Sequence, residues 1–538
     1  MKKFVTFLLA YSMLCLSLAG CGAKEQPISQ SDANAAQIQG TAIVLGDEGI
    51  TVDGEAISTD ETAAVYAAND IVYYEEGKDF TYGEGTEEDA HSQEEADAHT
   101  VVHITQPGTY VLSGQLSAGQ VAVDLGEDAE EDPGAVVTLV LNDVDIFCSV
   151  APAIIFYEVY ECGSADEETA TKDVDTTAAG ANVLIADGTV NNIYGSYVAR
   201  IYKPDSVELS EDGTEVVDSK KLHKYDAAFY SKKSMNVGAW GEGTGVLNIN
   251  AENEGLDAEL HLTINGGNIN ITSGNDGINT NEDYVSVTTI NGGNININVT
   301  GSTGEGDGID SNGWLVINGG TVISSACGFS QDAGIDSEMG IHVTGGTVMA
   351  SGNMLDRLED GGQNYAVFTF AEKQTGGTAY TLKNADGEVV SECTPTNDFS
   401  ILVISAPELT AGEYTFWQGE TQLAASAGAG GGMMGGFGGG KAPVGELPQI
   451  QEGAELPEMP EGMERPQNGR GDFKKNEDGT VTLPDGTTVD PSQIERPEGN
   501  KGGFGGRGQQ GGQGSGELST TFTINDGANY FSGVSAAE

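Results

Sequence analysis

Residues 261–280 read HLTINGGNINITSGNDGINT, and the pattern returns as VTTINGGNININVTGSTGEGDGID at 287–310 and as WLVINGGTVISSACGFSQDAGID at 314–336. A Gly-Gly turn recurs every 26 or 27 residues, at Asn265-Gly266-Gly267, Asn291-Gly292-Gly293, Asn318-Gly319-Gly320 and Thr344-Gly345-Gly346. A second turn recurs between these, at Glu254-Gly255-Leu256-Asp257, Asp276-Gly277-Ile278-Asn279, Asp307-Gly308-Ile309-Asp310 and Ala333-Gly334-Ile335-Asp336. Fixed periods in the twenties are typical of solenoids.

The residues between the turns alternate between apolar and polar side chains. Leu262 and Ile264 alternate with Thr263, and Ile269 and Ile271 alternate with Asn270. This period of two places the apolar side chains on one face of a β-strand. We therefore predict an all-β chain whose central part, residues 100–360, is a right-handed parallel β-helix with Ile, Val and Leu inside and Asn and Thr outside.

The flanking segments have different compositions. Residues 1–20 have the layout of a lipoprotein signal peptide that ends before Cys21, so we expect lipidation at Cys21 and attachment to the outer face of a bacterial cell membrane. Residues 21–40 read as a flexible tether, and 41–99 as N-terminal strands with an acidic loop. After the β-helix we predict a small β cap at 361–424, a disordered Gly-, Pro- and Met-rich segment at 425–517, and a final strand and tail at 518–538.

The composition argues against anionic partners. The chain has 83 acidic and 23 basic residues, for a formal net charge of −60. Nucleic acids and anionic membrane surfaces repel such a chain, so we expect no nucleic acid partner and membrane contact only through the N-terminal lipid. Neutral sugars and cations remain as partners.

The acidic turns predict a calcium site. Stacked repeats bring their carboxylates to within one strand spacing, where they repel each other unless cations lie between them. Calcium takes six to eight oxygen ligands from carboxylates, amides and backbone carbonyls. The predicted ligands are Glu254, Asp257, Asp276, Asn279, Asp307, Asp310, Asp332 and Asp336. The alternative is that these residues are solvated turn formers.

The same motifs carry a family resemblance. Together with Asp226-Ala227-Ala228-Phe229-Tyr230-Ser231-Lys232 and Thr109-Tyr110-Val111-Leu112-Ser113-Gly114, the two turns resemble clostridial carbohydrate-binding β-helix proteins over residues 100–424. The resemblance implies a pectate-lyase-like fold and calcium ligands at Asp276, Asp307 and Asp332. It also implies binding to cellulose or a polygalacturonate-like glycan, of the kind found in plant cell walls or other extracellular polysaccharide. The loops at 163–180 and 203–220 and the Gly-rich tail depart from the family pattern.

Aromatic side chains are the candidates for sugar contact, because their faces stack on pyranose rings. Tyr230, Trp240, Tyr284 and Trp314 lie in or beside the repeats, where each is about as well explained by packing. The leading hypothesis is a non-catalytic binding protein. One alternative is a calcium-dependent lyase or hydrolase, although residues 243–352 contain neither Lys nor Arg to serve as a base. A second alternative is a structural adhesin or surface-layer component that binds protein.

Overall fold

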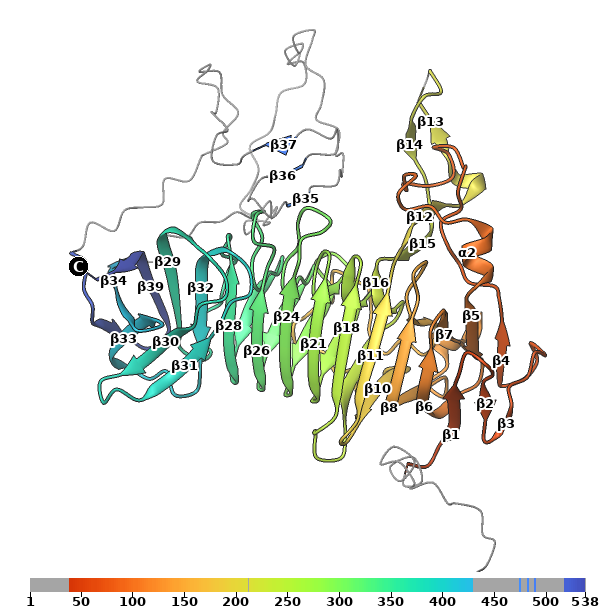
Figure 1. The fold of residues 1–538 in the computed structure, drawn as a ribbon, viewed down its shortest axis with the longest axis horizontal. Helices are drawn as coiled ribbons and strands as arrows, with labels where there is room; N and C mark the ends of the chain where they lie inside the picture. Colours follow the sequence, from red (N-terminus) through yellow and green to blue (C-terminus); the bar gives the residue numbers. More distant parts are fainter. Residues whose placement is uncertain are drawn as a thin grey trace, which may run out of the picture.

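The computed structural model describes residues 38–210, 212–428 and 517–537, together with the backbone of β35 (Lys474–Lys475), β36 (Val481–Thr482) and β37 (Thr488–Val489) (Figure 1). Strands dominate these ranges, as the all-β prediction requires. The helices among the described residues are short: α2 (Gln93–Asp97), η1 (Glu127–Glu131) and η2 (Pro204–Ser206). None of the helices in the described ranges has the length and hydrophobicity needed to cross a membrane.

Most of the chain stacks into three columns of parallel strands. Column A contains β10 (Ala181–Ala186), β17 (Met235–Trp240), β20 (His261–Ile264), β23 (Val287–Ile290), β25 (Trp314–Ile317) and β27 (Gly340–Val343). Column B contains β11 (Val190–Gly195), β18 (Val246–Ala251), β21 (Asn268–Ser273), β24 (Asn294–Val299), β26 (Thr321–Ser325) and β28 (Thr347–Gly352). Column C contains β5 (Thr100–Ile104), β7 (Gly119–Asp124), β9 (Ile154–Glu158), β16 (Ala227–Ser231), β19 (Glu254–Ala258) and β22 (Ile278–Thr280).

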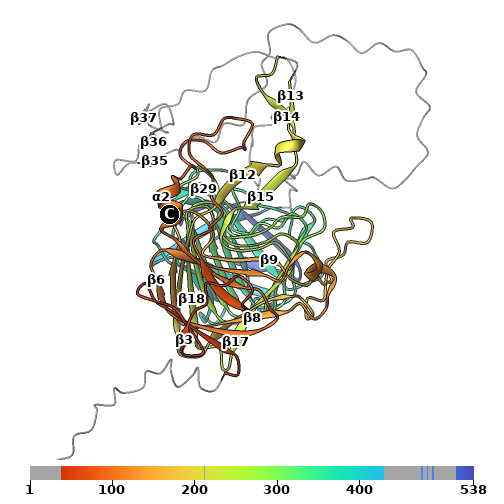
Figure 2. The same cartoon turned by 90° about the vertical axis from the view of Figure 1, so that its right-hand side faces the viewer.

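The chain visits these columns in a constant order, A then B then C, from β17 through β22. Columns A and B belong to one large mixed sheet, and column C belongs to a separate sheet of seven strands. The register is exact between repeats: Ile269 pairs with Ile295, which pairs with Val322. Like residues therefore lie above one another, with the apolar ones inside. Figure 2, a view turned by 90° from Figure 1, shows the strands around this interior.

The N-terminal strands extend the stack at one end. β1 (Thr41–Leu45) pairs in parallel with β6 (Gly108–Leu116), and β6 pairs with the long strand β8 (Val137–Phe147). β8 then pairs with both β10 and β11, so columns A and B diverge from it. β2 (Thr51–Val52) and β3 (Glu55–Ala56) form a small hairpin on β1, and β4 (Val65–Ala68) pairs antiparallel with β5. An arm of two antiparallel pairs projects from this end, formed by β12 (Val198–Tyr202) with β15 (Lys221–Tyr225), and β13 (Glu208–Leu209) with β14 (Val216–Asp218).

A separate β module covers the other end of the stack. Its strands are β29 (Tyr365–Gln374), β30 (Tyr380–Asn384), β31 (Val389–Cys393), β32 (Phe399–Ser405), β33 (Gly412–Gln418) and β34 (Thr421–Gly428). β32 pairs antiparallel with β28, the last strand of column B, which closes that exposed edge. The C-terminal strands β38 (Phe522–Ile524) and β39 (Ala528–Ala536) return to this module and pair with β33, β29 and β34. Its core contains stacked rings, with the Phe368 and Phe416 centroids 4.0 Å apart.

The two kinds of turn use glycine for different reasons. In the Asn-Gly-Gly corner between columns A and B, the second glycine has a positive φ, which is 102° at Gly267 and 97° at Gly293. In the Asp-Gly-Ile turn, glycine is needed because the backbones approach closely. A Cβ on Gly277 would overlap Ile297 Cγ2 and lie 2.6 Å from the carbonyl oxygen of Gly308.

Gly277→Ala is therefore expected to lower the free energy of unfolding by about 3 kcal/mol. Neither the Gly308 backbone of the next repeat nor the Ile297 side chain in the core can move aside without strain. The matched control is Gly412→Ala, where the nearest atom to the new Cβ is Tyr414 Cε2 at 3.8 Å. Chemical denaturation of the two variants measures the difference. Equal stabilities would contradict the packing described here.

Candidate functional site

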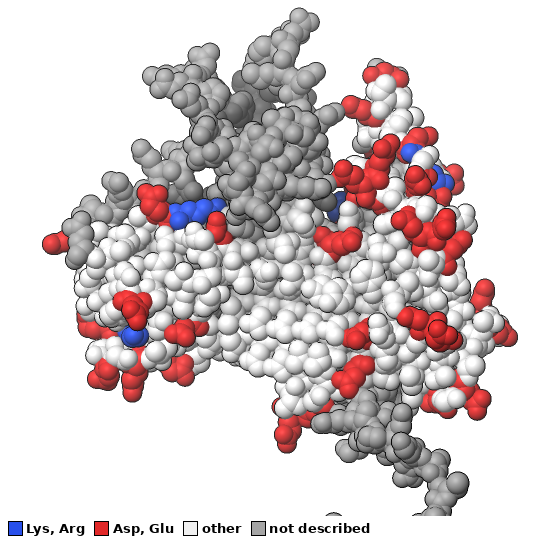
Figure 3. All heavy atoms as spheres, in the orientation of Figure 1, with Lys and Arg blue, Asp and Glu red and all other residues white. Residues whose placement is uncertain are grey.

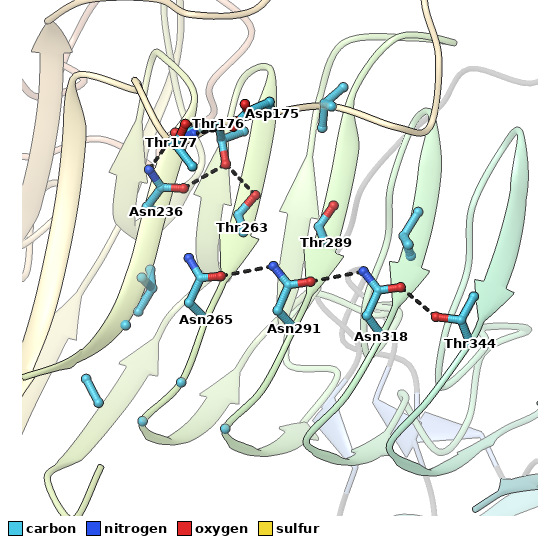
Figure 4. A pocket seen from close by; sticks show the side chains of 18 of the residues that line it. Asp175, Thr176, Thr177, Asn236, Thr263, Asn265, Thr289, Asn291, Asn318 and Thr344 are labelled. Carbon is cyan, nitrogen blue, oxygen red and sulfur yellow. Dashed lines mark hydrogen bonds between the residues drawn. The ribbon is translucent and has the colours of Figure 1, made fainter. Parts of the chain in front are cut away.

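A groove of about 1410 Å³ runs across the strands of column A. Figure 4 shows its floor, which is built from the outward side chains of successive strands. One row of the floor contains Asn182, Asn236, Thr263, Thr289, Val316 and His342, and the next contains Leu184, Gly238, Asn265, Asn291, Asn318 and Thr344. Each strand of column A thus contributes one residue to each row, at the strand spacing of about 4.8 Å.

The second row is held in place by a hydrogen-bonded ladder (Figure 4). Asn291 Nδ2 donates to Asn265 Oδ1 at 2.9 Å, and Asn318 Nδ2 donates to Asn291 Oδ1 at 3.0 Å. The Thr344 hydroxyl ends the ladder by donating to Asn318 Oδ1 at 2.6 Å. Each ladder bond uses one N–H of the donor amide and one lone pair of the acceptor amide. Each Asn amide has two N–H groups and two lone pairs, so the middle amides keep one donor and one acceptor for another molecule.

A loop closes one side of the groove. This loop, residues 163–180, is called the strap here. Thr176 of the strap is 5% exposed, and its Oγ1 lies 2.8 Å from Asn236 Oδ1 and 2.7 Å from Thr263 Oγ1. Asn236 Nδ2 also donates to the backbone carbonyl of Thr176 at 2.8 Å. The strap is therefore fastened to column A by side chains of the groove floor itself.

The charges of the groove lie at its margins and are mostly negative. The charged lining residues are Lys172, Asp173, Asp175, Glu242, Glu359 and Asp360. Lys172 forms an ion pair with Asp173 at 2.6 Å, so its charge is locally balanced. Burial and the nearby Lys172 ammonium lower the pKa of His342, which favours a neutral imidazole at neutral pH. The groove floor is therefore uncharged, and its surroundings repel anions.

The four aromatic residues predicted to contact sugar lie outside this groove. Tyr230 is only 1% exposed, its ring packs edge-on against Tyr225, and its hydroxyl donates to Glu259. The prediction for Tyr230 is wrong, because a buried ring has no face on which a sugar can stack. Trp240 and Tyr284 are 39% and 41% exposed, and Trp314 is half-buried in β25. No described contact brings these three together.

The residues that do line the groove were not predicted as a site. The sequence shows Asn and Thr outward along strands such as β20, β21 and β24, and Asn265, Asn291 and Asn318 begin three of the four Gly-Gly corners. The signal that would have found them is the recurrence of an amide at the same outward position in successive repeats. In these Asn-rich repeats, amides recur on the outward faces of both column A and column B. The strap lies against column A, and its position could not be predicted from the repeats.

The predicted calcium ligands do lie at neighbouring turns along column C. We call them the acidic column: Glu254, Asp257, Asp276, Asn279, Asp307, Asp310, Asp332 and Asp336. Leu256 pairs with Ile278, Ile278 pairs with Ile309, and the Asp336 N–H donates to the Ile309 carbonyl at 2.7 Å. Residues one position after these apolar ones, namely Asp257, Asn279, Asp310 and Asp336, therefore follow one another from coil to coil.

Hydrogen bonds between coils orient several of these carboxylates. The Asp307 N–H donates to Asp276 Oδ1 at 2.7 Å, and the Ala333 N–H donates to Asp307 Oδ1 at 2.5 Å. Asp332 Oδ2 accepts the Gly306 N–H at 2.8 Å. Each bond uses one oxygen of a carboxylate and leaves further lone pairs for another ligand.

Burial and nearby carboxylates raise the pKa values of four aspartates of the acidic column, Asp276, Asp307, Asp310 and Asp336. The pKa values of Asp276 and Asp307 lie well above the ordinary 3.8, first because both are buried and second because Asp310 faces Asp276 and Asp276 faces Asp307. Burial and then Glu338 raise the pKa of Asp310 to about 6. Burial and then Asp356 raise that of Asp336 to about 8. Because residues 243–352 contain no Lys or Arg, the coils themselves supply no basic side chain to balance these acids.

The oxygen donors of the acidic column are carboxylates, an amide and backbone carbonyls of neighbouring turns. Within the described ranges, no three His, Cys, Asp or Glu side chains gather closely enough to form a metal site alone. Calcium also accepts amide and backbone oxygens. Asn279 Oδ1 is such an oxygen: Asn279 is 6% exposed, and among the described residues this atom has no hydrogen-bond partner. A buried, unbonded amide oxygen costs free energy, which a cation beside it would offset.

The cysteines give no further site. Cys148, Cys162, Cys327 and Cys393 are free thiols, and burial raises the pKa of Cys148 and Cys393 to about 12. The predicted lipidation site Cys21 lies outside the described residues.

One family model and one solved structure are similar to this chain. Residues 98–361 match the family model described as carbohydrate-binding domain-containing protein. A similar solved structure is that of the polysaccharide lyase-like protein from C. thermocellum, as a gadolinium derivative, with 20% sequence identity and a TM-score of 0.31 over 57% of this chain and 83% of that chain. No curated protein matches the chain. The residues that match this family model, 98–361, include the groove floor and the acidic column.

Proposed function

We propose that this protein is a non-catalytic binding protein that holds a single chain of an extracellular polysaccharide in the groove of column A. The observation that carries the proposal is the ladder Asn265–Asn291–Asn318–Thr344, which offers amide donors and acceptors once per coil along an open groove. Sugar hydroxyls both donate and accept hydrogen bonds, and successive pyranoses in an extended glycan repeat at a similar spacing. The match of residues 98–361 to a carbohydrate-binding family model supports the same partner class.

The charge of the groove favours a neutral glycan over a uronate polymer. A uronate chain would bring a carboxylate on every ring past Asp175, Glu242 and Glu359. The lysine of the groove, Lys172, is already paired with Asp173 at 2.6 Å. Of the two glycans implied by the family resemblance, the cellulose-like one therefore fits this groove better than the pectin-like one.

The experiment is a calorimetric titration of the full chain with neutral β-linked oligosaccharides and with oligogalacturonate, each with calcium and with EDTA. We expect binding to the neutral oligosaccharides and at least tenfold weaker binding to oligogalacturonate. We also expect the recovered oligosaccharides to be intact. Tighter binding of oligogalacturonate would contradict the charge argument, and cleaved products would favour the lyase or hydrolase alternative. Absence of binding to every glycan would leave a protein-binding adhesin as the better hypothesis.

The finer architecture is part of the same proposal. We infer that columns A, B and C are the three faces of a right-handed parallel β-helix, because the chain follows them in constant order and the register repeats. The acidic column would hold calcium between coils, with Asp276, Asp307 and Asn279 as the central ligands. Bound calcium would neutralise the carboxylate charge and so stabilise the stack.

The proposed location is the outer face of a bacterial cell membrane, with the protein tethered through lipidated Cys21. Radiolabelled palmitate incorporated by the full precursor, and lost in Cys21→Ser, tests the anchor. Labelling that survives in Cys21→Ser would place the lipid elsewhere.

A further inference from the structure

The outer face of column B is a second surface with unusual chemistry. Its outward side chains form two rows across five strands, from β8 through β24. One row contains Asp145, Asn192, Asn248, Asn270 and Asn296, and the other contains Phe147, Tyr194, Asn250, Thr272 and Asn298. This face lies on a different sheet column from the groove and shares no residue with the two rows of the groove floor.

This face is almost uncharged on a strongly acidic protein. No Asp, Glu, Lys or Arg occurs in β11, β18, β21, β24 or β26. Asp145 stands at the edge of the face, in β8. Figure 3 shows the result: the middle of this view is uncharged, whereas acidic side chains gather toward both ends of the molecule. In a chain with 83 acidic residues, a surface without charged side chains requires an explanation.

The polar side chains of the face are held in place by one another. Asn192 Nδ2 donates to Asp145 Oδ1 at 2.5 Å, and Asn248 Nδ2 donates to Asn192 Oδ1 at 2.9 Å. Asn270 and Asn296 continue the ladder with bonds of 2.9 and 3.1 Å. A side chain already held in one rotamer loses less entropy when it binds a partner. As in the groove, each middle amide keeps one N–H and one lone pair for that partner.

Exposed aromatic rings adjoin the ladder at one end. Phe147 and Tyr194 are 46% and 43% exposed, and their ring centroids lie 6.0 Å apart on neighbouring strands. Val190, at the start of β11, is 50% exposed. Exposed aromatic rings next to fixed amides suit a ligand whose surface presents both C–H groups and hydroxyls.

We propose that the outer face of column B adsorbs to the flat surface of a packed, uncharged polysaccharide, such as a crystalline β-glucan or chitin. A single sugar chain would be exposed to water on an open sheet face, whereas a packed surface covers many strands at once. Because β11, β18, β21, β24 and β26 carry no charged side chain, adsorption costs no desolvation of ions on these strands. A second copy of this chain is a poorer partner, because each copy carries a formal charge of −60.

The inference goes beyond glycan binding in the groove and does not require it. The test therefore measures the two surfaces separately, by adsorption of the full chain to microcrystalline cellulose and chitin, and by titration with soluble neutral oligosaccharides. Thr272→Glu places a carboxylate in the middle of the outer face of column B. Thr289→Glu makes the same change on the groove floor, also at a half-buried outward position.

Thr272→Glu and Tyr194→Ala are expected to reduce adsorption to the insoluble polysaccharides at least fivefold and to leave soluble binding unchanged. Thr289→Glu is expected to do the opposite. Circular dichroism and melting curves identify any variant that fails to fold, and Asn250→Ser on the same face provides an uncharged control that keeps a polar side chain. Unchanged adsorption of folded Thr272→Glu and Tyr194→Ala would overturn the proposal, as would adsorption lost through Thr289→Glu alone. Reversible dimerisation that Thr272→Glu abolishes, seen by sedimentation, would also overturn it in favour of a second copy.

Discussion

Calcium is expected to raise the melting temperature of this protein by several degrees, and EDTA is expected to abolish the rise. The reason lies in the acidic column, where Asp276 and Asp307 are buried near other carboxylates and residues 243–352 contain no Lys or Arg. A ligand that binds only the folded state at 100 times its Kd contributes about 2.7 kcal/mol. Differential scanning calorimetry with calcium, with magnesium and with EDTA measures the effect. We expect magnesium to be weaker because it requires stricter octahedral geometry.

The sign of the pH dependence provides a second check on the same site. In EDTA, the raised pKa values of Asp310, to about 6, and Asp336, to about 8, mean that the folded state binds more protons than the unfolded state. The stability contribution of these two groups is therefore fully present below their unfolded pKa of about 3.8 and is lost as the pH rises through about 6 and about 8. With calcium bound to the ionised carboxylates, we expect this part of the decline to disappear.

Asp276→Asn distinguishes the effect of calcium binding on stability from the effect of packing. The Asp307 N–H donates to Asp276 Oδ1 at 2.7 Å, and the amide oxygen of the variant can still accept this bond. The substitution removes the ionisable carboxylate. We expect this variant to melt above the unmodified protein in EDTA and to respond less to calcium. Asp386→Asn, in an exposed turn of the C-terminal module, is the matched control and should keep the full calcium response. Identical melting curves with calcium and EDTA in the unmodified protein would refute the calcium site.

Asn291→Ala is expected to weaken binding of soluble neutral oligosaccharides about tenfold, which corresponds to about 1.4 kcal/mol. Asn291 is the middle amide of the groove ladder, so its loss removes its own contacts with the glycan. It also frees Asn265 and Asn318 from the bonds of 2.9 and 3.0 Å that fix their orientation. Isothermal titration calorimetry gives the affinity, and the melting temperature reports the structural cost.

The control for this variant is Asn296→Ala. Asn296 donates to Asn270 at 3.1 Å in the same kind of ladder, but on the outer face of column B. Its removal costs a comparable hydrogen bond and leaves the groove intact. If the two variants lost soluble binding equally, the loss would reflect general loosening of the coils and not contacts in the groove.

Much of the architecture could be predicted from local pattern alone. The alternation of Ile269 and Ile271 with Asn270 determines which side chains face inward, because the period of a strand is a property of a few consecutive residues. The regular spacing of the two Gly turns determines that equivalent residues stack. That stacking also brings Asp276, Asp307 and Asp310 close together. Accordingly, Asp310 raises the pKa of Asp276, and Asp276 raises the pKa of Asp307.

Only the tertiary structure decided which outward faces are open and what lies against them. The sequence pattern treats Thr263 and Thr272 alike, as polar residues on strands, yet the strap covers the first and leaves the second half-exposed. The sequence predicts Tyr230 as a sugar contact, but in the fold its ring is buried against Tyr225. Burial of this kind depends on segments far apart in the chain, such as Thr176 meeting Thr263, and a periodic pattern carries no information about where an insertion between repeats comes to rest.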